Sequence, residues 1–393
     1  MPTRTPISSQ IPSTLTASHP SAFLSCNIRE LISLAANGLV AMFDADKQLF
    51  CHRLLRTEQG LVREGLSPRY TIMTVLGLRE LELAGMDSPF DARAIYASFI
   101  RDTSWIRGLG DLGLLIWFTA AFDPAHLGAL LSKFDCEAAL DRFPDAQAAR
   151  TMELAWFLAA LAHAAETSPQ LCDTLTNLSL RTYQRLKANQ GDYGLFGHMG
   201  TKNSFAGRLR GRVGSFADQV YPVYAMSKYS QVFGVEEALI AALACAKAIC
   251  GAQGELGQWW WLYDARNGRV SSRYPVYSVH QHGMAPMALF AVEEASGKNF
   301  SDSIYKGLRW LYGANELGID MIDSAQKLIW RCVLPENKFN KYWEMASSRV
   351  RSSKRKTKVG SLKILYEQRP YEYGWLLFAF AKKAGIGSGL RDA

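Results

Sequence analysis

The sequence alternates between two kinds of predicted helix along almost its whole length. Helices of the first kind are apolar around much of their circumference, and are expected at 68–84, 110–121, 148–166, 215–233, 279–296 and 370–384. Helices of the second kind are amphipathic, and are expected at 27–45, 90–101, 124–134, 168–188, 235–250 and 300–313. A helix that is apolar nearly all round has to be buried, and an amphipathic helix can cover it. The alternation therefore predicts an all-α fold, an (α/α)6 toroid of alternating inner and outer helices.

Three long connections distinguish a closed toroid from an open helical solenoid. A solenoid needs repeats of nearly constant length, whereas here the inner helices are unevenly spaced because long connections occupy 189–214, 252–278 and 314–369. Long connections in a compact domain are usually functional. All three precede an inner helix, so a toroid would place them at one end of the barrel. We expect the binding site at that end.

The basic residues are concentrated in one segment. Residues 347–363 hold seven Lys and Arg and no acid, so the rest of the chain has 44 − 7 = 37 basic against 36 acidic residues. A nucleic-acid-binding body would carry basic residues across a whole face, so no nucleic-acid partner is expected. We predict one toroid domain over 23–393, with 347–363 as an exposed basic loop suited to peripheral contact with an anionic polymer or membrane surface.

Cysteine use and the N-terminus indicate a cytoplasmic protein. The seven cysteines are scattered without a C-x-x-C or zinc-type spacing, and we interpret them as reduced, mostly buried thiols. Residues 1–22 are rich in Ser, Thr and Pro, lack a signal-peptide pattern, and are expected to form a disordered tail. The longest apolar run, 112–122, is too short to span a bilayer. No metal or cofactor is predicted.

The first and third long connections, with the helices that follow them, supply part of the predicted site. Asp218 forms a capping-box pattern with Ser215, so it is a candidate cap as well as a candidate catalytic acid. Glu372 opens the last inner helix and is a second candidate catalytic carboxylate. Aromatic, His and Arg side chains suit an anionic sugar. The predicted substrate-binding residues of this group are Tyr193, His198, Arg208, Arg212, Tyr373 and, from the first inner helix, Arg69.

The second long connection is the most aromatic stretch of the chain. Three consecutive tryptophans cannot all point into one core, so at least one should be available for stacking on a sugar ring. The alternative is that they pack between helix ends. His280 and His282 diverge on a helix and make poor joint metal ligands. The predicted substrate-binding residues here are Trp259, Trp260, Trp261 and Arg269, and the candidate catalytic residues are Tyr263, Asp264, Tyr277 and His280.

Three resemblances follow from these motifs. The alternating hairpins resemble the α/α-toroid group, which includes six-hairpin glycosidases, sugar epimerases, polysaccharide lyases, squalene cyclases and prenyltransferases. The segment WWWLYDAR (259–266), followed by YPVYSVHQHGMAPMAL, is similar to the C-terminal helical part of glucuronyl C5-epimerases. That resemblance implies site roles for Tyr263, Asp264 and Arg266, and for Tyr277 and His280. The segment GQWWW resembles the QW repeat of squalene cyclases, although the D-x-D-D acid motif is missing.

Three hypotheses follow. The first is an enzyme that acts by acid/base chemistry on an oligo- or polysaccharide, including a uronic-acid-containing one, in bacterial exopolysaccharide biosynthesis; the reaction would be epimerisation, elimination or hydrolysis. The second is an isoprenoid cyclase-like toroid, which predicts a dry, closed aromatic cavity and a strong acid. The third is a non-catalytic toroid that binds glycan or protein, which predicts an open groove without converging acid and base groups.

Overall fold

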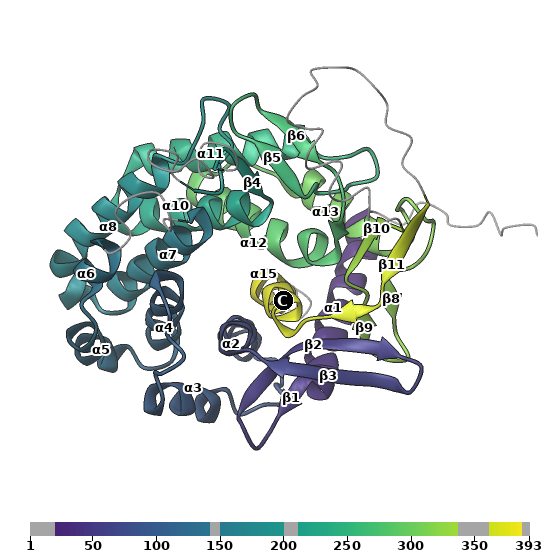
Figure 1. Cartoon of the computed structure of the whole chain (residues 1–393), viewed down its shortest axis with the longest axis horizontal. Helices are drawn as coiled ribbons and strands as arrows, with labels where there is room; N and C mark the ends of the chain where they lie inside the picture. Colours follow the sequence, from purple (N-terminus) through teal and green to yellow (C-terminus); the bar gives the residue numbers. More distant parts are fainter. Residues whose placement is uncertain (1–19, 142–149, 200–210, 337–360, 387–393) are drawn as a thin grey trace, which may run out of the picture.

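The computed structural model describes residues 20–141, 150–199, 211–336 and 361–386. Within these ranges the predicted alternation is confirmed, and the helices form two concentric rings (Figure 1). The inner ring consists of α2 (Pro68–Leu83), α4 (Leu109–Phe122), α7 (Thr151–Thr167), α10 (Ala217–Phe233), α12 (Ala285–Ser296) and α15 (Pro370–Ile386). The outer ring consists of α1 (Pro20–Gly38), α3 (Ala92–Arg101), α5 (Leu127–Lys133), α8 (Cys172–Lys187), α11 (Glu236–Gly251) and α13 (Ser301–Leu311).

The inner ring is closed by direct packing of the last inner helix on the first. Neighbouring inner helices contact one another in chain order, and α15 packs along α2. Gly77 and Gly374 allow the two backbones to touch: a Cβ on Gly77 would lie 2.1 Å from the Gly374 carbonyl oxygen, and one on Gly374 would lie 2.5 Å from the Met73 carbonyl oxygen. Glycine is otherwise unfavourable inside a helix, so close packing is the reason for both residues.

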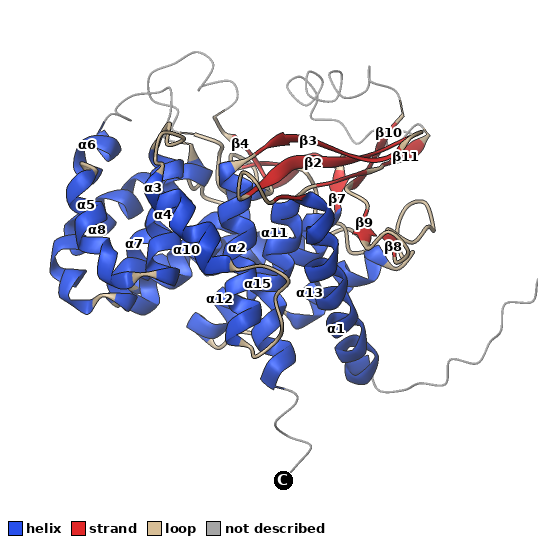
Figure 2. Ribbon diagram, turned by 90° about the horizontal axis from the view of Figure 1, so that it is seen from below, coloured by secondary structure: helices blue, strands red, loops and turns tan. Residues whose placement is uncertain are grey.

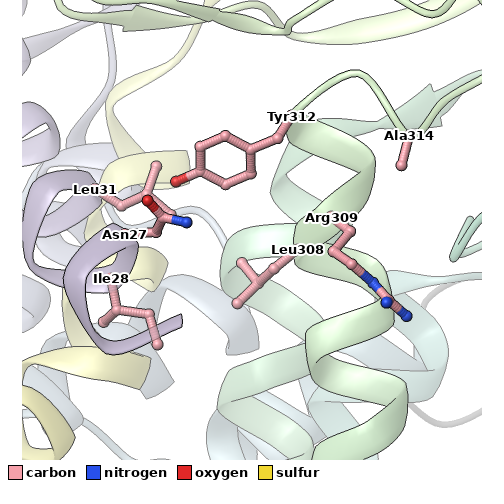
Figure 3. Close-up of a pocket in the computed structure, with 7 residues that line it drawn as sticks. All are labelled: Asn27, Ile28, Leu31, Leu308, Arg309, Tyr312 and Ala314. Atoms are coloured by element: carbon pink, nitrogen blue, oxygen red, sulfur yellow. The ribbon is translucent and has the colours of Figure 1, made fainter. Parts of the chain in front are cut away.

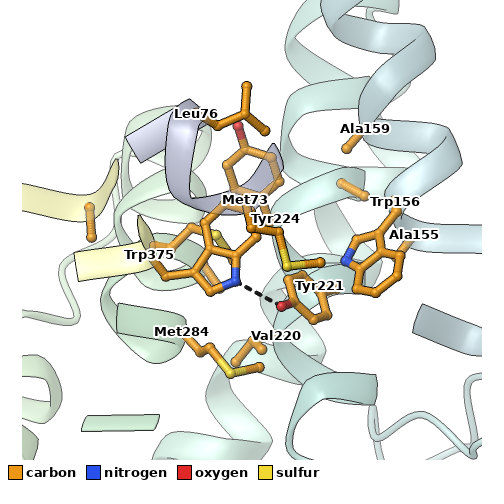
Figure 4. Packing of buried hydrophobic residues seen from close by; sticks show 14 of the residues in the cluster. Met73, Leu76, Ala155, Trp156, Ala159, Val220, Tyr221, Tyr224, Met284 and Trp375 are labelled. Carbon is orange, nitrogen blue, oxygen red and sulfur yellow. Dashed lines mark hydrogen bonds between the residues drawn. The ribbon is translucent and has the colours of Figure 1, made fainter. Parts of the chain in front are cut away.

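Aromatic side chains fill the centre of the ring. Trp117, Trp156, Tyr221 and Trp375 come from four inner helices and contact one another in series (Figure 4). Ring centroids lie 5.3 Å apart for Trp156 and Tyr221, and 6.0 Å apart for Tyr221 and Trp375. The Trp375 Nε1 group donates a hydrogen bond of 2.9 Å to the Tyr221 hydroxyl, which satisfies both buried polar groups. The inner helices are apolar all round because their inner faces meet in this aromatic core.

The strands gather at one end of the helical rings (Figure 2). Small antiparallel sheets join the long connections to one another, so the prediction that these connections lie at one end is confirmed. One sheet pairs β4 (Val213–Ser215) with β5 (Leu262–Asp264) and β6 (Arg269–Ser272). Another pairs β7 (Val276–Tyr277) with β10 (Cys332–Pro335) and β11 (Leu362–Leu365). A third pairs β2 (Leu49–Thr57) with β1 (Phe43–Asp44), β3 (Gly60–Leu66) and β12 (Glu367–Gln368).

Several boundaries differ from those predicted. The first outer helix starts at Pro20, inside the predicted tail, and ends at Gly38, well before the predicted 45, because the chain turns into β1 and the unpredicted β2–β3 hairpin. Residues 1–19 lie outside the described residues, as does most of the basic run. Lys363 of that run is in β11, paired with Leu334, so this end of the predicted loop is a strand. The other described elements are a short helix, α6 (Cys136–Asp141), and the pair β8 (Ile322–Asp323) and β9 (Leu328–Ile329). Four short helical segments complete the set: η1 (Leu39–Met42), η2 (Pro124–His126), η3 (Pro169–Leu171) and the π-helical turn η4 (His280–Met284).

Other sequence expectations concern membranes and thiols. None of the helices in the described ranges combines the length and hydrophobicity needed to cross a bilayer. The cysteines with described side chains are free thiols, and Cys51, Cys136, Cys245 and Cys332 are buried.

The contact between α2 and α15 generates a stability prediction. Gly374→Ala should lower the free energy of unfolding by about 1–3 kcal/mol, because the added methyl group meets backbone atoms that cannot move aside. Urea denaturation followed by circular dichroism measures the loss. Gly128→Ala is the matched control: Gly128 is also helical, in α5, but a Cβ there meets nothing within 4 Å. That variant should be neutral or more stable by up to about 1 kcal/mol. Equal effects of the two substitutions would contradict the packing argument.

Candidate active site

Four inner helices of the described chain carry a carboxylate in their first turn. These residues are Asp111 in α4, Glu153 in α7, Asp218 in α10 and Glu372 in α15, and all four are buried. The positive end of a helix dipole stabilises a carboxylate there. Because the inner helices lie side by side with these ends at the strand-covered end of the rings, residues distant in sequence converge on one region (Figures 1 and 2).

Arg69 links three of the inner helices. From the first turn of α2 its Nε donates to Asp111 Oδ1, and its Nη2 lies 3.9 Å from Glu153 Oε1. The Arg107 backbone N–H donates to the second oxygen of Asp111 at 2.8 Å, so both Asp111 oxygens are engaged. The Arg69 side chain is 35% exposed, whereas that of Asp111 is only 3% exposed. Arg69 is therefore anchored at one edge of its guanidinium and accessible from solvent.

The surroundings of Glu153 favour the protonated form of its carboxyl group. Burial raises its pKa above the usual value, and the nearby Arg69 opposes this effect only in part. Its side chain keeps 11% exposure, and the Arg69 guanidinium lies over the neighbouring Trp156 ring at 5.9 Å. Gly110 makes room for it, because a Cβ at Gly110 would lie 2.8 Å from Glu153 Cγ. A partly accessible carboxyl with a raised pKa beside a cation suits general-acid chemistry.

His198 and Asp218 form a second polar pair in this region. Asp218 Oδ2 lies 3.0 Å from His198 Nδ1, and it also accepts hydrogen bonds from the backbone N–H and the hydroxyl of Ser215, both at 2.8 Å. The predicted capping box is therefore present, and Asp218 orients a histidine as well. The His198 carbonyl oxygen accepts from the Thr151 backbone N–H at 3.0 Å, which places His198 beside the start of α7. The His198 side chain is 28% exposed, so its ring is accessible.

A buried ionic network occupies the neighbouring part of the same end. Arg331 donates to Glu372 Oε1, and its Nε lies 3.4 Å from Glu367 Oε1. Arg369 Nε binds the same Glu367 oxygen at 2.6 Å and its Nη1 donates to the Tyr70 hydroxyl at 2.9 Å. Burial raises the pKa of Glu372 to about 7, although Arg331 and Arg369 lower it. Its second oxygen has no hydrogen-bond partner among the described residues.

Aromatic rings border this network. The Tyr70 and Tyr371 rings lie 4.5 Å apart, and His52 stacks on Tyr70 at 5.3 Å. The Arg331 guanidinium lies 5.0 Å above the Tyr277 ring, which in turn contacts the ring of His280 at 5.1 Å. This chain of contacts places the predicted residues Tyr277, His280 and Glu372 together at the same end of the toroid.

Tyr277 and His280 are constrained by burial. The pKa of Tyr277 is raised to about 12, and that of His280 is lowered to about 3, in both cases chiefly because burial penalises the charged form. His280 Nδ1 lies 3.5 Å from the Trp259 carbonyl oxygen. His282 is fully buried with its pKa likewise lowered to about 3. Both histidines therefore stay neutral at ordinary pH and differ from the accessible His198.

Five other predicted site residues are engaged in packing instead of facing a ligand. Trp259 is fully buried against Phe216, and Trp260 donates from Nε1 to the Ala252 carbonyl oxygen. The hydroxyl groups of Tyr263 and Tyr373 bind backbone groups: Tyr263 accepts from the Trp260 N–H, and Tyr373 accepts from the Ile329 N–H and donates to the Lys327 carbonyl oxygen. Asp264 accepts hydrogen bonds from Arg266 within the β5–β6 turn, and these bonds keep its pKa low. Trp259 and Trp260 therefore agree with the alternative prediction, in which the tryptophans pack instead of stacking on a sugar.

The remaining predicted residues lie in or beside the sheet formed by β4, β5 and β6, or outside the described residues. Tyr193 is 58% exposed and packs beside Gly268 at the β5–β6 turn, and Arg212 and Arg269 are also exposed. Trp261 is partly buried, and its carbonyl oxygen accepts from the Phe216 N–H. Arg208 lies outside the described residues.

The sequence analysis missed Asp111 and Glu153 as site residues. Both occupy the third position of an inner helix, as Glu372 does, and that shared position was the available signal. Gly110 and Gly113 were a second signal, because they bring α4 close to α7: a Cβ at Gly113 would lie 2.8 Å from Phe157 Cα. In the sequence, Asp111 and Glu153 both lie within strongly apolar segments.

Solved structures provide a comparison for the fold and for this end of the molecule. No family model matches the sequence, and no curated protein matches it either. A sugar epimerase from a ruminal bacterium is similar in structure, with a TM-score of 0.61 and 12% identity over 92% of this chain and 99% of that chain. A possible member of the GH105 family from Salmonella enterica has a TM-score of 0.58 and 12% identity over 96% of this chain and 97% of that chain.

A third structure agrees with these two. An unsaturated glucuronyl hydrolase from Bacillus sp. GL1, described as responsible for the degradation of glycosaminoglycan, has a TM-score of 0.56 and 13% identity over 92% of this chain and 96% of that chain. Such likeness over nearly whole chains establishes the architecture. The chain has the six-hairpin (α/α)6 toroid fold. At this level of identity the fold is what the likeness shows, and the site has to be judged on its own residues.

The toroid also contains a cavity away from the polar cluster. It has a volume of about 220 Å³ and lies between α1 and α13, the first and last outer helices (Figure 3). Its lining is mostly apolar, with Arg309 as its charged residue, and consists of Asn27, Ile28, Leu31, Leu308, Arg309, Tyr312 and Ala314. No carboxylate or histidine lines it, so its lining does not supply groups for acid/base catalysis. In the described residues no group of three or more His, Cys, Asp or Glu side chains is arranged to hold a metal ion.

The buried carboxyl of Glu372 generates a pH prediction. Its folded-state pKa of about 7 exceeds the unfolded value near 4.3, so the folded state binds the proton more tightly. That contribution to stability is complete below about pH 4 and is lost as pH rises through about 7. The free energy of unfolding of the unmodified protein, minus that of Glu372→Gln, should fall by roughly 1–3 kcal/mol between about pH 5 and pH 8. Urea titrations at several pH values measure this difference.

Glu336→Gln, which removes an exposed carboxylate just after β10, is the control and should show no such trend. A difference for Glu372→Gln that stays constant with pH would show that Glu372 is ionised throughout.

Proposed function

We propose that this protein is a carbohydrate-active enzyme that hydrolyses a uronic-acid-containing oligosaccharide at the cluster around Arg69. The observation that carries the proposal is the position of Glu153. It is a carboxyl with a raised pKa, beside an accessible guanidinium and an accessible histidine, and the three groups come from different parts of the chain. The roles follow from this arrangement.

Arg69 supports recognition of an anionic sugar. Its side chain is 35% exposed, and a planar guanidinium binds a carboxylate through paired hydrogen bonds. Asp111 holds the other edge and fixes its orientation. Tyr70, which follows Arg69 in α2, and Tyr371 are partly buried aromatic residues that can border a sugar ring bound there.

Glu153 and His198 support the proton transfers of hydrolysis. Glu153, whose pKa is raised by burial, would donate a proton to the oxygen of the scissile bond. His198 would activate the attacking water, because Asp218 holds its Nδ1 and no residue of the described ranges forms a hydrogen bond with its Nε2. Asp218 would act as a positioning residue that fixes the ring and its tautomer. An acid and a base that converge on one region also argue against the non-catalytic toroid.

The structural neighbours support the same substrate class. One of them is an unsaturated glucuronyl hydrolase described in complex with the disaccharide dGlcA-GalNAc6S, at a TM-score of 0.58 and 10% identity. Another is described as specific for heparin. The isoprenoid-cyclase hypothesis receives no such support, since the central aromatic rings pack against one another (Figure 4). A role in exopolysaccharide assembly and a cytoplasmic location remain predictions from the sequence.

The His198–Asp218 pair supports epimerisation as a second candidate. A histidine held by a carboxylate can remove the proton next to a sugar carboxylate bound by Arg69. Epimerisation exchanges a carbon-bound proton for solvent deuterium and leaves the glycosidic bond intact, whereas hydrolysis releases a new reducing end. Mass spectrometry and a reducing-end assay on the same reaction in D2O therefore distinguish the two reactions.

The central prediction concerns Glu153. The protein should release sugar from glucuronyl disaccharides, either saturated or with a C4–C5 double bond at the non-reducing end. Glu153→Gln should lower kcat by about 10²–10⁴, because the proton donor is lost while the shape of the side chain is kept. The release of reducing ends, and the loss of the ultraviolet absorbance of the double bond, measure the rate.

The matched control is Glu236→Gln. Glu236 also lies in the first turn of a helix, the outer helix α11, but is exposed and far from the cluster in the fold. This variant should keep full activity, and both variants should retain the melting temperature of the unmodified protein. Full activity of Glu153→Gln, or no turnover of any uronide by the unmodified protein, would refute the assignment.

A further inference from the structure

The Arg69 guanidinium is held unequally by its two carboxylate partners. Asp111 takes its Nε edge and is nearly inaccessible, with both oxygens already bound. Glu153 lies at the longer distance of 3.9 Å from Nη2 and is the more accessible of the two. A ligand carboxylate that approaches Arg69 from solvent will therefore compete with Glu153 and leave the Asp111 contact intact.

We propose that an anionic sugar protonates its own general acid: when its carboxylate binds Arg69, Glu153 takes up a proton from solvent. This inference rests on the proposed function and adds to it a device that couples substrate recognition to catalysis. The proton goes to a Glu153 carboxyl oxygen and is the one later donated to the scissile oxygen. No other reactant is needed, because water supplies the proton.

Electrostatics gives the reason. Three cationic or ionisable basic groups face Glu153: Arg69 from α2, Arg150 before α7, and His198 before β4. Asp111 from α4 is the facing anion. A ligand carboxylate on Arg69 cancels the main attraction that favours ionised Glu153, and adds a second negative charge close by. A like charge placed close to a carboxylate disfavours its ionised form, so the bound ligand raises the pKa of Glu153 further.

Glu153 is the group that takes the proton because its neighbours are fixed. Asp111 accepts hydrogen bonds at both oxygens, which favour its charged form. The sugar carboxylate gains the direct contact with Arg69. Burial already raises the pKa of Glu153. A smaller further rise in this pKa is therefore needed to protonate Glu153 than to protonate an exposed carboxylate. A neutral sugar lacks the carboxylate and leaves the pKa of Glu153 unchanged. The protein should therefore discriminate against neutral sugars in reaction rate as well as in binding.

Binding of two matched probes tests this coupling without turnover. Methyl β-glucuronide carries the carboxylate, and methyl β-glucoside has the same ring without it. Calorimetry in two buffers of different ionisation enthalpy, at near-neutral pH, gives the number of protons taken up. Uptake approaching one proton per glucuronide is expected, and none for the glucoside. The dissociation constant of the glucuronide should rise by up to tenfold per pH unit above neutrality, because each bound ligand brings a proton.

Glu153→Gln distinguishes Glu153 from other proton acceptors. Glutamine keeps the shape without the titration, so the variant should bind the glucuronide without proton uptake and with little pH dependence. Uptake that persists in Glu153→Gln would assign the proton to another group, with His198 the nearest candidate, and would overturn the inference. Glu236→Gln should behave like the unmodified protein. Failure of the glucuronide to bind, or binding that changes little with pH, would also overturn it.

The outcome is separate from that of the proposed hydrolysis. If glucuronide binds with proton uptake but no uronide is cleaved, the coupling holds and the reaction assignment fails. If uronides are cleaved but the probe binds without proton uptake, the reaction assignment holds and the coupling fails.

Discussion

The packing of α15 on α2 is the contact on which the rest of the structure depends. It closes the ring, and it does so through Gly77 and Gly374, whose missing side chains let two helix backbones touch. The same contact sets Tyr371 and Glu372 beside Tyr70, so closure of the fold and assembly of one wall of the site are a single event. A toroid that failed to close would separate these residues, although each helix could still form.

The first-turn carboxylates of the inner helices differ in their surroundings, because each is buried among different partners. The first-turn carboxylates gain from the helix dipole but lose solvation, and the balance differs from one helix to the next. Asp111 is fully hydrogen-bonded, Asp218 is bound by a serine and a histidine, and Glu153 lies 3.9 Å from the Arg69 Nη2 group. Similar positions on similar helices thus give an anchor for Arg69, a support for His198 and a candidate proton donor.

The small sheets position the groups that the helices do not carry. Arg331 leads into β10 and reaches Glu372, while Arg369 follows β12 and reaches Tyr70. Their common partner is Glu367, a buried carboxylate in β12. Strand pairing between separate connections holds these side chains more firmly than isolated loops would. Aromatic rings from several inner helices pack against one another below them (Figure 4), and this supports our placement of the proposed site at the strand-covered end.

The sequence by itself determined the ring of helices, because helical periodicity and apolar circumference are local properties that each segment displays alone. It also placed the long connections at one end, and it indicated Arg69, His198, Asp218, Tyr277, His280 and Glu372. It could not show that Trp259, Tyr263 and Tyr373 point into packing, or that Asp111 and Glu153 face Arg69. Which way a side chain points, how deeply it is buried and which charges surround it depend on helices far apart in the chain, and only the closed tertiary structure brings those helices together.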